Sequence, residues 1–406
     1  MFRLSRLLSG GYLLIALLVT ALTLIGFPLG PAPFQLAPLG PAGTPIVVEI
    51  AYGTEKRAWL EDAAARFATT NPRVRGRPIQ IKLTGVGSRE IVTRIVQDEY
   101  QPTVVSPASM IQIELLRDEW AKRKGGEIFL SGADAPQPLV ITPLVIVMWE
   151  ERGKALWPNG TGDFWKQIHA ALAAPGGWPE VGGKAEWGLV KFGHTSPETS
   201  NSGIQSLVLL AYGYHEKATD LVVGDVLDTG FQTWLDEIEN SVQEFGDSTG
   251  TFMDSVVNFG PGKYDMVAVY ESLAIGQVEA NQTAGKIEQA EGRWGQPLRI
   301  YYPPANIMSE HPYATLSAPW VTPEQREVAA LFRTYLLSQP VQELALQYGF
   351  RPANSNVTLV NSDPNNPFNR YKDNGVQIDI QQVVSTPPAE VLNELLTIWR
   401  RKNYDR

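Results

Sequence analysis

Cysteine is absent from this chain of 406 residues. Disulfides, thiol nucleophiles and thiolate metal sites are therefore excluded, and so is the lipid-acceptor cysteine of a bacterial lipoprotein. Basic side chains are also scarce, because 34 Lys and Arg stand against 43 Asp and Glu, which gives a formal net charge of −9. Nucleic-acid binding needs a basic surface that neutralises phosphates, so we do not expect a nucleic-acid partner.

Residue patterns typical of metal sites and nucleotide hydrolysis are missing as well. The sequence has neither the HExxH pair of zinc peptidases nor a P-loop. Its four histidines, His169, His194, His215 and His311, are scattered without the spacing of metal ligands. We therefore expect no enzyme activity, no catalytic residue, no metal and no cofactor. A secreted hydrolase, the alternative, would need a catalytic group that nothing in the sequence marks.

The N-terminal region carries the pattern of an exported protein. No charged residue lies between Arg6 and Glu49, and the basic N-terminus precedes an apolar run at residues 12–29. This run approaches the roughly 20 residues that span a bilayer, which favours a retained anchor over a cleaved signal peptide. We assign residues 1–30 to a signal peptide or membrane anchor and residues 31–45 to a Pro/Gly-rich spacer. The rest is expected outside the cytoplasm, in the periplasm or on the outer face of the cell membrane.

Alternating strand and helix patterns begin near residue 46. Residues 46–51 and 79–83 read as strands, and each precedes an amphipathic helical segment, the second at 89–99. This order predicts right-handed βαβ units in a parallel sheet. Further strands are expected at 187–192 and 266–270, and further helices at 202–212, from Pro323 behind a Thr322 N-cap, and at 388–401.

The chain is long enough to bury two separate cores. An apolar run at 139–149 reads as a buried strand that carries the chain from one lobe to the other. We predict an α/β fold of two lobes with mostly parallel sheets and a hinge. The first lobe would comprise residues 46–142 plus 300–406, and the second residues 143–299.

The most informative loop reads GHTSPETSNSG at 193–203, between a predicted strand and a predicted helix. The first turn of a helix has unpaired N–H groups and a positive dipole end, so small hydroxyl side chains there can surround a polar or anionic ligand. Ser200, Asn201 and Ser202 are the candidate ligand-binding residues. Ordinary N-capping by Ser200 is the alternative interpretation.

Two further loops repeat this arrangement at the ends of predicted strands. TGVGSR at 84–89 contains Ser88, and AYGT at 51–54 contains Thr54. Ligands of open α/β sheets collect at the carboxyl ends of strands, so these hydroxyls are expected to meet in one crevice, although a plain turn explains each loop taken alone. Glu90 stands where a dinucleotide fingerprint has its third glycine, which disfavours dinucleotide binding.

The order of several segments resembles the type II periplasmic solute-binding proteins of ABC importers, in the branch that includes molybdate- and sulfate-binding proteins. These segments are the strand, helix and Gly-Ser opening, PLVIVMWE at 143–150, SPETSNSG at 196–203, YDMVAVYES at 264–272 and the block at 317–352. The resemblance implies that Tyr270 joins Thr54, Ser88 and the residues 200–202 as a ligand contact. It places the hinge near residues 143 and 301.

The same resemblance implies a small-molecule or oxyanion ligand and a partner that is an ABC permease or another envelope protein, with the membrane reached through the N-terminal segment. Two acidic residues are not expected in an oxyanion-binding site, namely Glu55, which follows Thr54, and Glu271, which follows Tyr270. A carboxylate in the cleft would repel a divalent anion by several kcal/mol. A membrane-anchored envelope sensor or protein-interaction module with the same fold, but without transport, is the alternative function.

Overall fold

The computed structural model describes residues 43–276 and 284–403. The expected signal peptide or anchor and most of the proposed spacer lie outside the described residues. In the described part of the chain, no helix has the length and apolar character that crossing a membrane requires.

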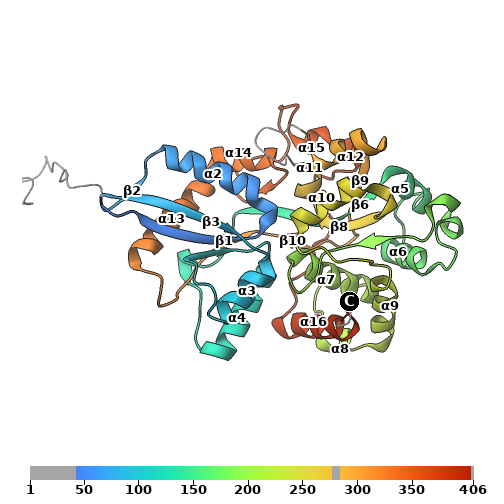
Figure 1. Ribbon diagram of the computed structural model, residues 1–406, viewed down its shortest axis with the longest axis horizontal. Coiled ribbons are helices and arrows are strands. Elements are labelled where there is room, and N and C mark those ends of the chain that lie inside the picture. Colours follow the sequence, from blue (N-terminus) through green and yellow to red (C-terminus); the bar gives the residue numbers. More distant parts are fainter. Residues whose placement is uncertain (1–42, 277–283, 404–406) are drawn as a thin grey trace, which may run out of the picture.

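Two sheets with helices packed around them lie side by side along the long axis of the molecule (Figure 1). The first sheet has the strand order β2-β3-β1-β4-β11-β5. Its strands are β1 (Ile46–Tyr52), β2 (Arg73–Val74), β3 (Arg77–Gly85), β4 (Val104–Ser106), β5 (Gln137–Pro138) and β11 (Pro312–Thr315). The expected opening strands are therefore confirmed, and β1 pairs in parallel with both β3 and β4.

The second sheet is built around the long strand β6 (Val140–Trp149), which confirms the expected apolar strand. Its other strands are β7 (Phe192–Gly193), β8 (Met266–Tyr270), β9 (Leu298–Tyr301), β10 (Met308–Ser309) and β12 (Arg351–Pro352). All of these pair with β6 in antiparallel fashion except β7, which pairs in parallel with β8.

The prediction of mostly parallel sheets needs correction here. In the second sheet the strands other than β6 share one direction, but the hydrogen-bonded ladders are mostly antiparallel because β6 runs the opposite way through their middle. In the first sheet β11 likewise runs antiparallel to its neighbour β4. Both β6 and β11 arrive from the other sheet rather than through a βαβ crossover, so the crossover rule does not set their direction. The short strand β2 is also antiparallel, because it forms a hairpin with β3.

Helices cover both sheets. Beside the first sheet lie α2 (Arg57–Thr69), α3 (Ser88–Val96), α4 (Met110–Lys124), α13 (Pro323–Leu336) and α14 (Gln339–Gln347). Around the second lie α5 (Glu150–Leu156), α6 (Phe164–Ala173), α7 (Asn201–His215), α8 (Val223–Val226), α9 (Thr229–Glu239), α10 (Thr249–Phe259), α11 (Glu271–Ile275) and α12 (Lys286–Trp294). The short α15 (Pro367–Arg370) follows α14, and α16 (Ala389–Asn403) ends the described chain. Short 3-10 turns are η1 (Thr54–Lys56), η2 (Gly132–Asp134), η3 (Trp178–Val181), η4 (Ala185–Trp187), η5 (Gly260–Gly262) and η6 (Lys372–Asn374).

Local sequence signals explain most of these elements. Leu60, Ala63 and Phe67 form the buried side of α2, as their helical spacing predicts. Thr322 caps α13 through a capping box with Gln325, which confirms that prediction. The strand expected at 187–192 is wrong for most of its length, because Trp187 ends the turn η4 and only Phe192 enters β7.

The chain returns from the second sheet to the first between β10 and β11. This return lies later than the crossing expected near residue 301, because Tyr301 still belongs to β9 and pairs with Ile146 of the second sheet. The outgoing crossing through β6 agrees with the expected position near Pro143, which pairs with Met308 of β10.

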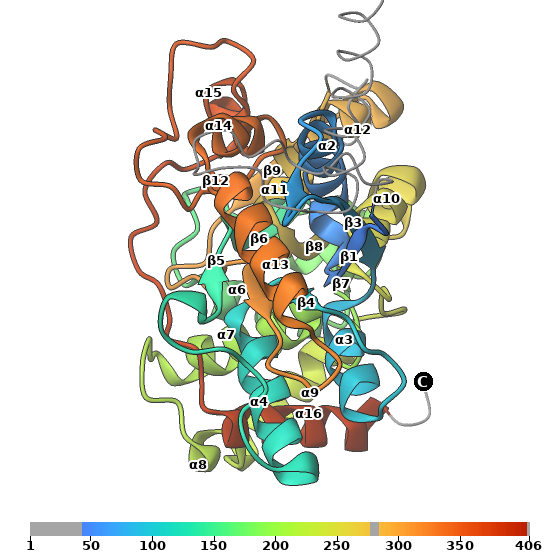
Figure 2. The same ribbon diagram turned by 90° about the vertical axis from the view of Figure 1, so that its left-hand side faces the viewer.

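The C-terminal helix α16 contacts both lobes. It packs against α7 and α8 of the second lobe and also against α4 of the first. Figures 1 and 2 show it along the lower edge of the molecule. Buried apolar residues of α4, α7 and α16, such as Leu116, Leu207 and Leu396, belong to one continuous hydrophobic cluster. The helix therefore covers a seam between the lobes.

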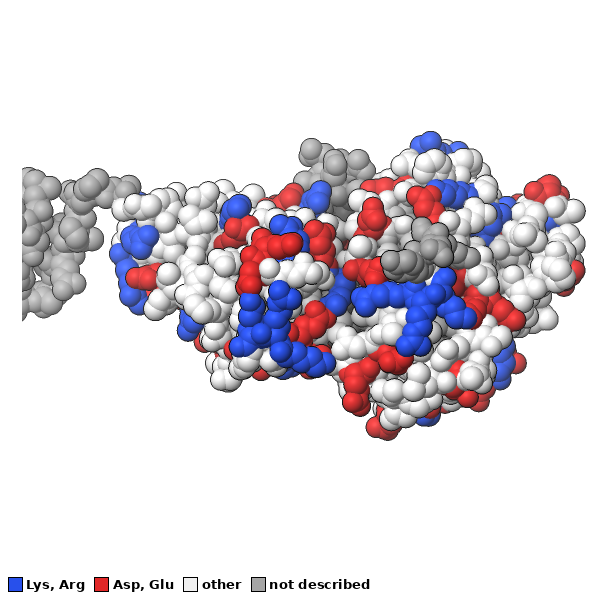
Figure 3. All heavy atoms as spheres, turned by 60° about the horizontal axis from the view of Figure 1, so that its bottom comes forward, with Lys and Arg blue, Asp and Glu red and all other residues white. Residues whose placement is uncertain are grey.

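Charges on that lower face are mixed in sign (Figure 3). Basic groups stand next to acidic ones on this face. The helices α4 and α16 carry ion pairs such as Lys122 with Asp118 and Arg400 with Glu198. Ion pairs of this kind are exposed and contribute little to stability.

Candidate functional site

The carboxyl ends of strands from both sheets face one region between the lobes. β1 leads into Thr54, β3 into Ser88 and β4 into the N-terminus of α4. From the second sheet, β7 leads into the loop before α7, and β8 ends at Tyr270. The strand-end rule that selected the candidate loops therefore locates them correctly, at the boundary between two lobes.

Asn201 links the lobes directly. Its side-chain oxygen accepts hydrogen bonds from Ser109 Oγ at 2.8 Å and from Gln112 Nε2 at 3.0 Å, both at the start of α4. Its amide nitrogen donates to the Tyr270 hydroxyl at 3.0 Å. All four side chains are buried, so the bonded atoms of this bridge depend on their partners, whereas Gln112 Oε1 has no partner in the described chain. Two of the candidate ligand-binding residues are thus in contact, and one of them spans the cleft.

A cluster of hydroxyl groups lies at the N-termini of α7 and α10. Ser202 Oγ is 2.6 Å from Thr195 Oγ1 and 2.8 Å from Thr249 Oγ1, and Ser200 Oγ is 3.2 Å from Thr249 Oγ1. Ser200 is the N-cap residue of α7, yet its side chain makes no capping hydrogen bond. The simple capping interpretation is therefore wrong, because the Ser200 hydroxyl turns toward the cluster.

Thr54 and Ser88 occupy the first lobe's side of the same boundary. Ser88 Oγ accepts a hydrogen bond from the backbone N–H of Ala108 at 3.0 Å. Thr54 faces the start of α10, since a Cβ added to Gly250 would lie 3.9 Å from Thr54 Oγ1. The loop of Ser88 touches the second lobe, because a Cβ added to Gly87 would lie 2.7 Å from the carbonyl oxygen of Thr199. A side chain at residue 87 would force the lobes apart.

The charge of Glu55 is compensated inside the protein. Its side chain is 5% exposed, and its Oε1 lies 3.0 Å from Lys56 Nζ. Burial alone would raise the pKa of Glu55, but the charge of Lys56 and the neighbouring His311 lower it to about 2. His311 Nδ1 lies 3.2 Å from the same oxygen without the alignment of a hydrogen bond. Glu55 is therefore ionised within an ion pair, and its repulsion of an anion is largely cancelled.

Glu271 is turned away from the cleft and is held by Arg351. Arg351 Nε and Nη2 each donate to this carboxylate at 2.8 Å, and the Tyr302 hydroxyl also donates to it. The carboxylate is fully buried, and such a two-point ion pair is expensive to break from one side. The sequence-based objection to an anionic ligand from Glu271 is removed.

His194 packs against the loop before α7 through buried polar contacts. Its Nε2 lies 3.0 Å from Glu239 Oε1 and its Nδ1 lies 2.8 Å from the carbonyl oxygen of Thr195. Burial works against the charged ring, but the Glu239 carboxylate raises the pKa of His194. Trp399 of α16 donates to the other oxygen of Glu239 at 2.9 Å. His194 is therefore a buried structural residue that connects the loop to the C-terminal helix.

Several residues of this region were missed by sequence reasoning. Thr249 and Ser109 carry no distinctive spacing, but both stand in short hydroxyl-rich runs that enter a helix, STGT at 248–251 and SPASM at 106–110. That is the signal which selected residues 200–202. His311 gave no local signal, because its neighbours Glu55 and Lys56 are distant in the sequence.

The expectation that nothing in the sequence marks a hydrolase needs a correction, because the run GDSTG at 246–250 matches the GxSxG spacing of serine hydrolases. Its backbone differs from a nucleophile elbow, because Ser248 has φ −144 and ψ 151, an unstrained extended conformation at the N-cap of α10. The Ser248 hydroxyl lies 2.8 Å from Thr251 Oγ1, and no histidine forms a hydrogen bond to it in the described chain. The geometry gives this serine no activating base.

Comparison with solved structures identifies the same overall fold in known binding proteins. A periplasmic thiamin binding protein aligns with a TM-score of 0.59 at 11% identity, covering 92% of this chain and 99% of that one. The fructose-6-phosphate-bound periplasmic binding protein AfuA from Actinobacillus pleuropneumoniae aligns with a TM-score of 0.56 at 13% identity, covering 89% and 99%. The sulfate-binding protein SubI from Mycobacterium tuberculosis H37Rv aligns with a TM-score of 0.50 at 18% identity, covering 77% and 88%.

At these identities the solved structures establish the two-lobed fold and leave the ligand open. The search of curated protein sequences finds no match. The model of one protein family, described as bacterial extracellular solute-binding protein, matches residues 48–351. That range includes the β1 loop, the α7 loop and the end of β8. The chain therefore belongs to the bacterial extracellular solute-binding protein family.

Proposed function

We propose that this protein captures a small polar or anionic solute between its two lobes, outside the cytoplasm, and delivers it to an ABC-type importer. Binding would involve no chemical reaction. The convergence of hydroxyls and helix N-termini from both lobes carries this proposal. Ser88 begins α3 and Thr249 begins α10, while Ser109 and Ser200 occupy the N-cap positions of α4 and α7 without making a capping hydrogen bond through their side chains.

The physical basis is replacement of the solute's water shell by groups of the protein. Helix N-termini and hydroxyls supply hydrogen-bond donors without adding a carboxylate. Asn201 accepts hydrogen bonds from Ser109 and Gln112 of the other lobe, so a closed arrangement gains hydrogen bonds that an open one lacks. A solute with polar groups that bridge the same two walls would shift the population toward closure.

A thermal-shift screen of the full-length chain tests this proposal. The solutes are inorganic oxyanions, sugars, amino acids and metal ions, each added to the wild type, to Ser202→Ala and to the control Ser355→Ala on the exposed surface. A solute present at about 100 times its Kd should raise the unfolding free energy by roughly 2.7 kcal/mol. We expect one solute class to stabilise the wild type and the control but not Ser202→Ala.

Delivery to an importer requires a second measurement. Deleting the gene should abolish cellular uptake of the solute that the screen identifies. If uptake continues unchanged, the envelope sensor is favoured over the transporter component. If no solute stabilises the wild type, the binding proposal fails and a protein-interaction module with the same fold becomes the better interpretation.

A further inference from the structure

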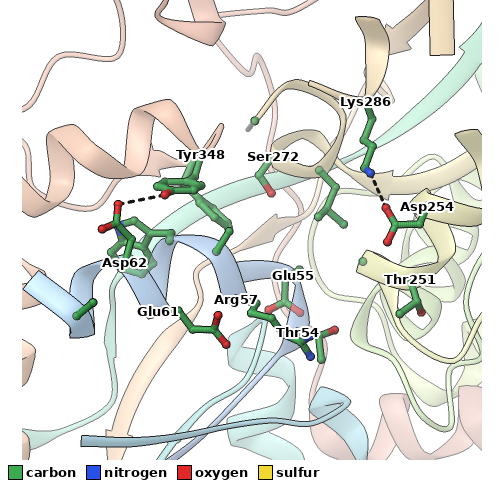
Figure 4. Close-up of a pocket in the computed structure, with 17 residues that line it drawn as sticks. Thr54, Glu55, Arg57, Glu61, Asp62, Thr251, Asp254, Ser272, Lys286 and Tyr348 are labelled. Atoms are coloured by element: carbon green, nitrogen blue, oxygen red, sulfur yellow. Dashed lines mark hydrogen bonds and ion pairs between the residues drawn. The ribbon is translucent and has the colours of Figure 1, made fainter. Parts of the chain in front are cut away.

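A cavity of about 610 Å³ opens between the lobes (Figure 4). Gly250 and Thr251, which follow Thr249 of the hydroxyl cluster, are among the residues that line it. One wall consists of η1 and the first turns of α2, with Thr54, Arg57 and Glu61. The opposite wall consists of α10, α11 and α12, with Asp254, Ser272 and Lys286. The cavity therefore shares Thr54 with the proposed binding site and extends it to one side.

Its size indicates an organic solute. Pockets for small organic ligands typically measure about 300 to 1,000 Å³. The cavity of about 610 Å³ lies in the middle of that range. A single tetrahedral oxyanion is much smaller and would leave most of this space as water.

Each wall carries charges of both signs. On the α2 wall, Arg57 and Glu61 have no ion-pair partner among residues 43–276 and 284–403, although Glu61 accepts a hydrogen bond from the Tyr52 hydroxyl at 3.1 Å. On the opposite wall, Lys286 Nζ lies 2.5 Å from Asp254 Oδ1. Arg57 and Glu61 stand one helical turn apart, a spacing of about 5–6 Å between Cβ atoms. A cation and an anion are thus presented to the same ligand.

Ser272 provides an independent indication of a bound group. It lies in the first turn of α11 and is 3% exposed. Its Oγ has no hydrogen-bond partner in the described part of the chain, and Figure 4 shows it at the edge of the cavity. Buried polar atoms are nearly always hydrogen-bonded, so a ligand group that reaches Ser272 would satisfy this hydroxyl.

We propose that the captured solute is a compact organic zwitterion, with its anionic group at Arg57, its cationic group at Glu61 and a polar group at Ser272. This inference rests on the proposed function and specifies its substrate class. A zwitterion has no net charge, so the paired carboxylates Glu55 and Asp254 do not repel it as they would a divalent anion.

Calorimetric titration of the full-length chain with individual amino acids tests the proposal. Each amino acid that binds is compared with its N-acetyl derivative, which lacks the cationic group, and with its amide, which lacks the anionic group. Removing either charge should weaken binding at least tenfold. The variant Arg57→Met should weaken binding of the amino acid at least tenfold and leave binding of its amide unchanged. The variant Glu61→Gln should also weaken binding of the amino acid at least tenfold and leave binding of its N-acetyl derivative unchanged.

Controls separate this inference from the proposed function. Arg123→Met on the exposed surface of α4 should bind like the wild type, and unchanged melting temperatures of the unliganded variants exclude misfolding. The protein could instead bind an inorganic oxyanion or a neutral sugar, with an affinity that neither Arg57→Met nor Glu61→Gln changes. That result would overturn the proposal of a zwitterionic solute but would leave the proposal of solute capture intact. The absence of any binding solute would overturn both.

Discussion

Individual side chains at the lobe boundary are paired before any solute arrives. Glu55 is balanced by Lys56, and Glu271 by Arg351. Because removing one member of a buried pair leaves an unpaired buried charge, these residues fix the shape of the site more than they select the ligand. Selection falls to cavity-lining groups outside such pairs, among them Arg57, Glu61 and the hydroxyl of Ser272, which has no hydrogen-bond partner in the described chain.

His311 should make the protein sensitive to acid. Burial and the charge of Lys56 lower its pKa from 6.5 to about 4. Between these values the unfolded chain binds more protons than the folded one, so the unfolding free energy falls as the pH drops from 6.5 toward 4. Glu55, lowered from 4.5 to about 2, adds the same trend below pH 4.5.

The substitution His311→Gln should therefore flatten the pH dependence between pH 6.5 and about 4. Urea unfolding of the wild type and the variant across this window measures the two slopes. His194 acts in the opposite sense, since a raised pKa stabilises the fold at low pH and that stability is lost as the pH rises through it. A variant with the wild-type slope would contradict the role assigned to His311.

Among the elements, α13 depends on a local signal that can be tested alone. Thr322 accepts the N–H of Gln325 at 3.2 Å, and the Gln325 side chain accepts the N–H of Thr322 at 2.9 Å. Thr322→Ala removes one half of this box and should lower the unfolding free energy by about 1 kcal/mol. The exposed Thr358→Ala is the matched control and should stay within about 0.5 kcal/mol of the wild type in the same urea titration. Equal losses in both variants would argue against a capping effect.

The elements that sequence predicted well have strong local periodicity. The apolar run of β6, the strand β8 and the helix α7 were all expected near their observed bounds. The failed strand at 187–192 contains Gly188, which directly follows the turn η4 and whose φ of 68 lies outside the extended region. The opposite direction of β6 was not predictable, because it depends on which sheet the strand joins rather than on its own residues.

The candidate site was predictable in part for the same reason. Ser200, Asn201 and Ser202 stand at a strand-to-helix loop, so the strand-end rule located them near Tyr270. Ser109 carries the same kind of signal in its hydroxyl-rich run, but Gln112 and His311 carry none, because their importance comes from contacts with residues that are distant in the sequence. The cavity beside Thr54 depends on the spacing between α2 and α10, which no local pattern encodes.

Taken as one body, the molecule has lobes joined by chain crossings into β6, from β10 to β11 and from α14 to β12, by the Asn201 bridge and by α16. Asn201→Ala should weaken the contact between the lobes, because Ser109 and Gln112 lose their acceptor. The radius of gyration from small-angle X-ray scattering should increase relative to the wild type and to the exposed control Asn159→Ala. An unchanged radius would show that α16 and the crossings hold the lobes together without this bridge.

The hydrophobic cluster that runs through α4, α7 and α16 has a thermodynamic consequence. Separating the lobes would expose part of this apolar seam to water, and exposure of apolar surface raises the heat capacity. Solute capture would then lower the heat capacity by a corresponding amount, because closing the lobes buries the seam again. Since apolar association weakens on cooling, the protein would hold its solute less firmly in the cold than its hydrogen bonds alone suggest.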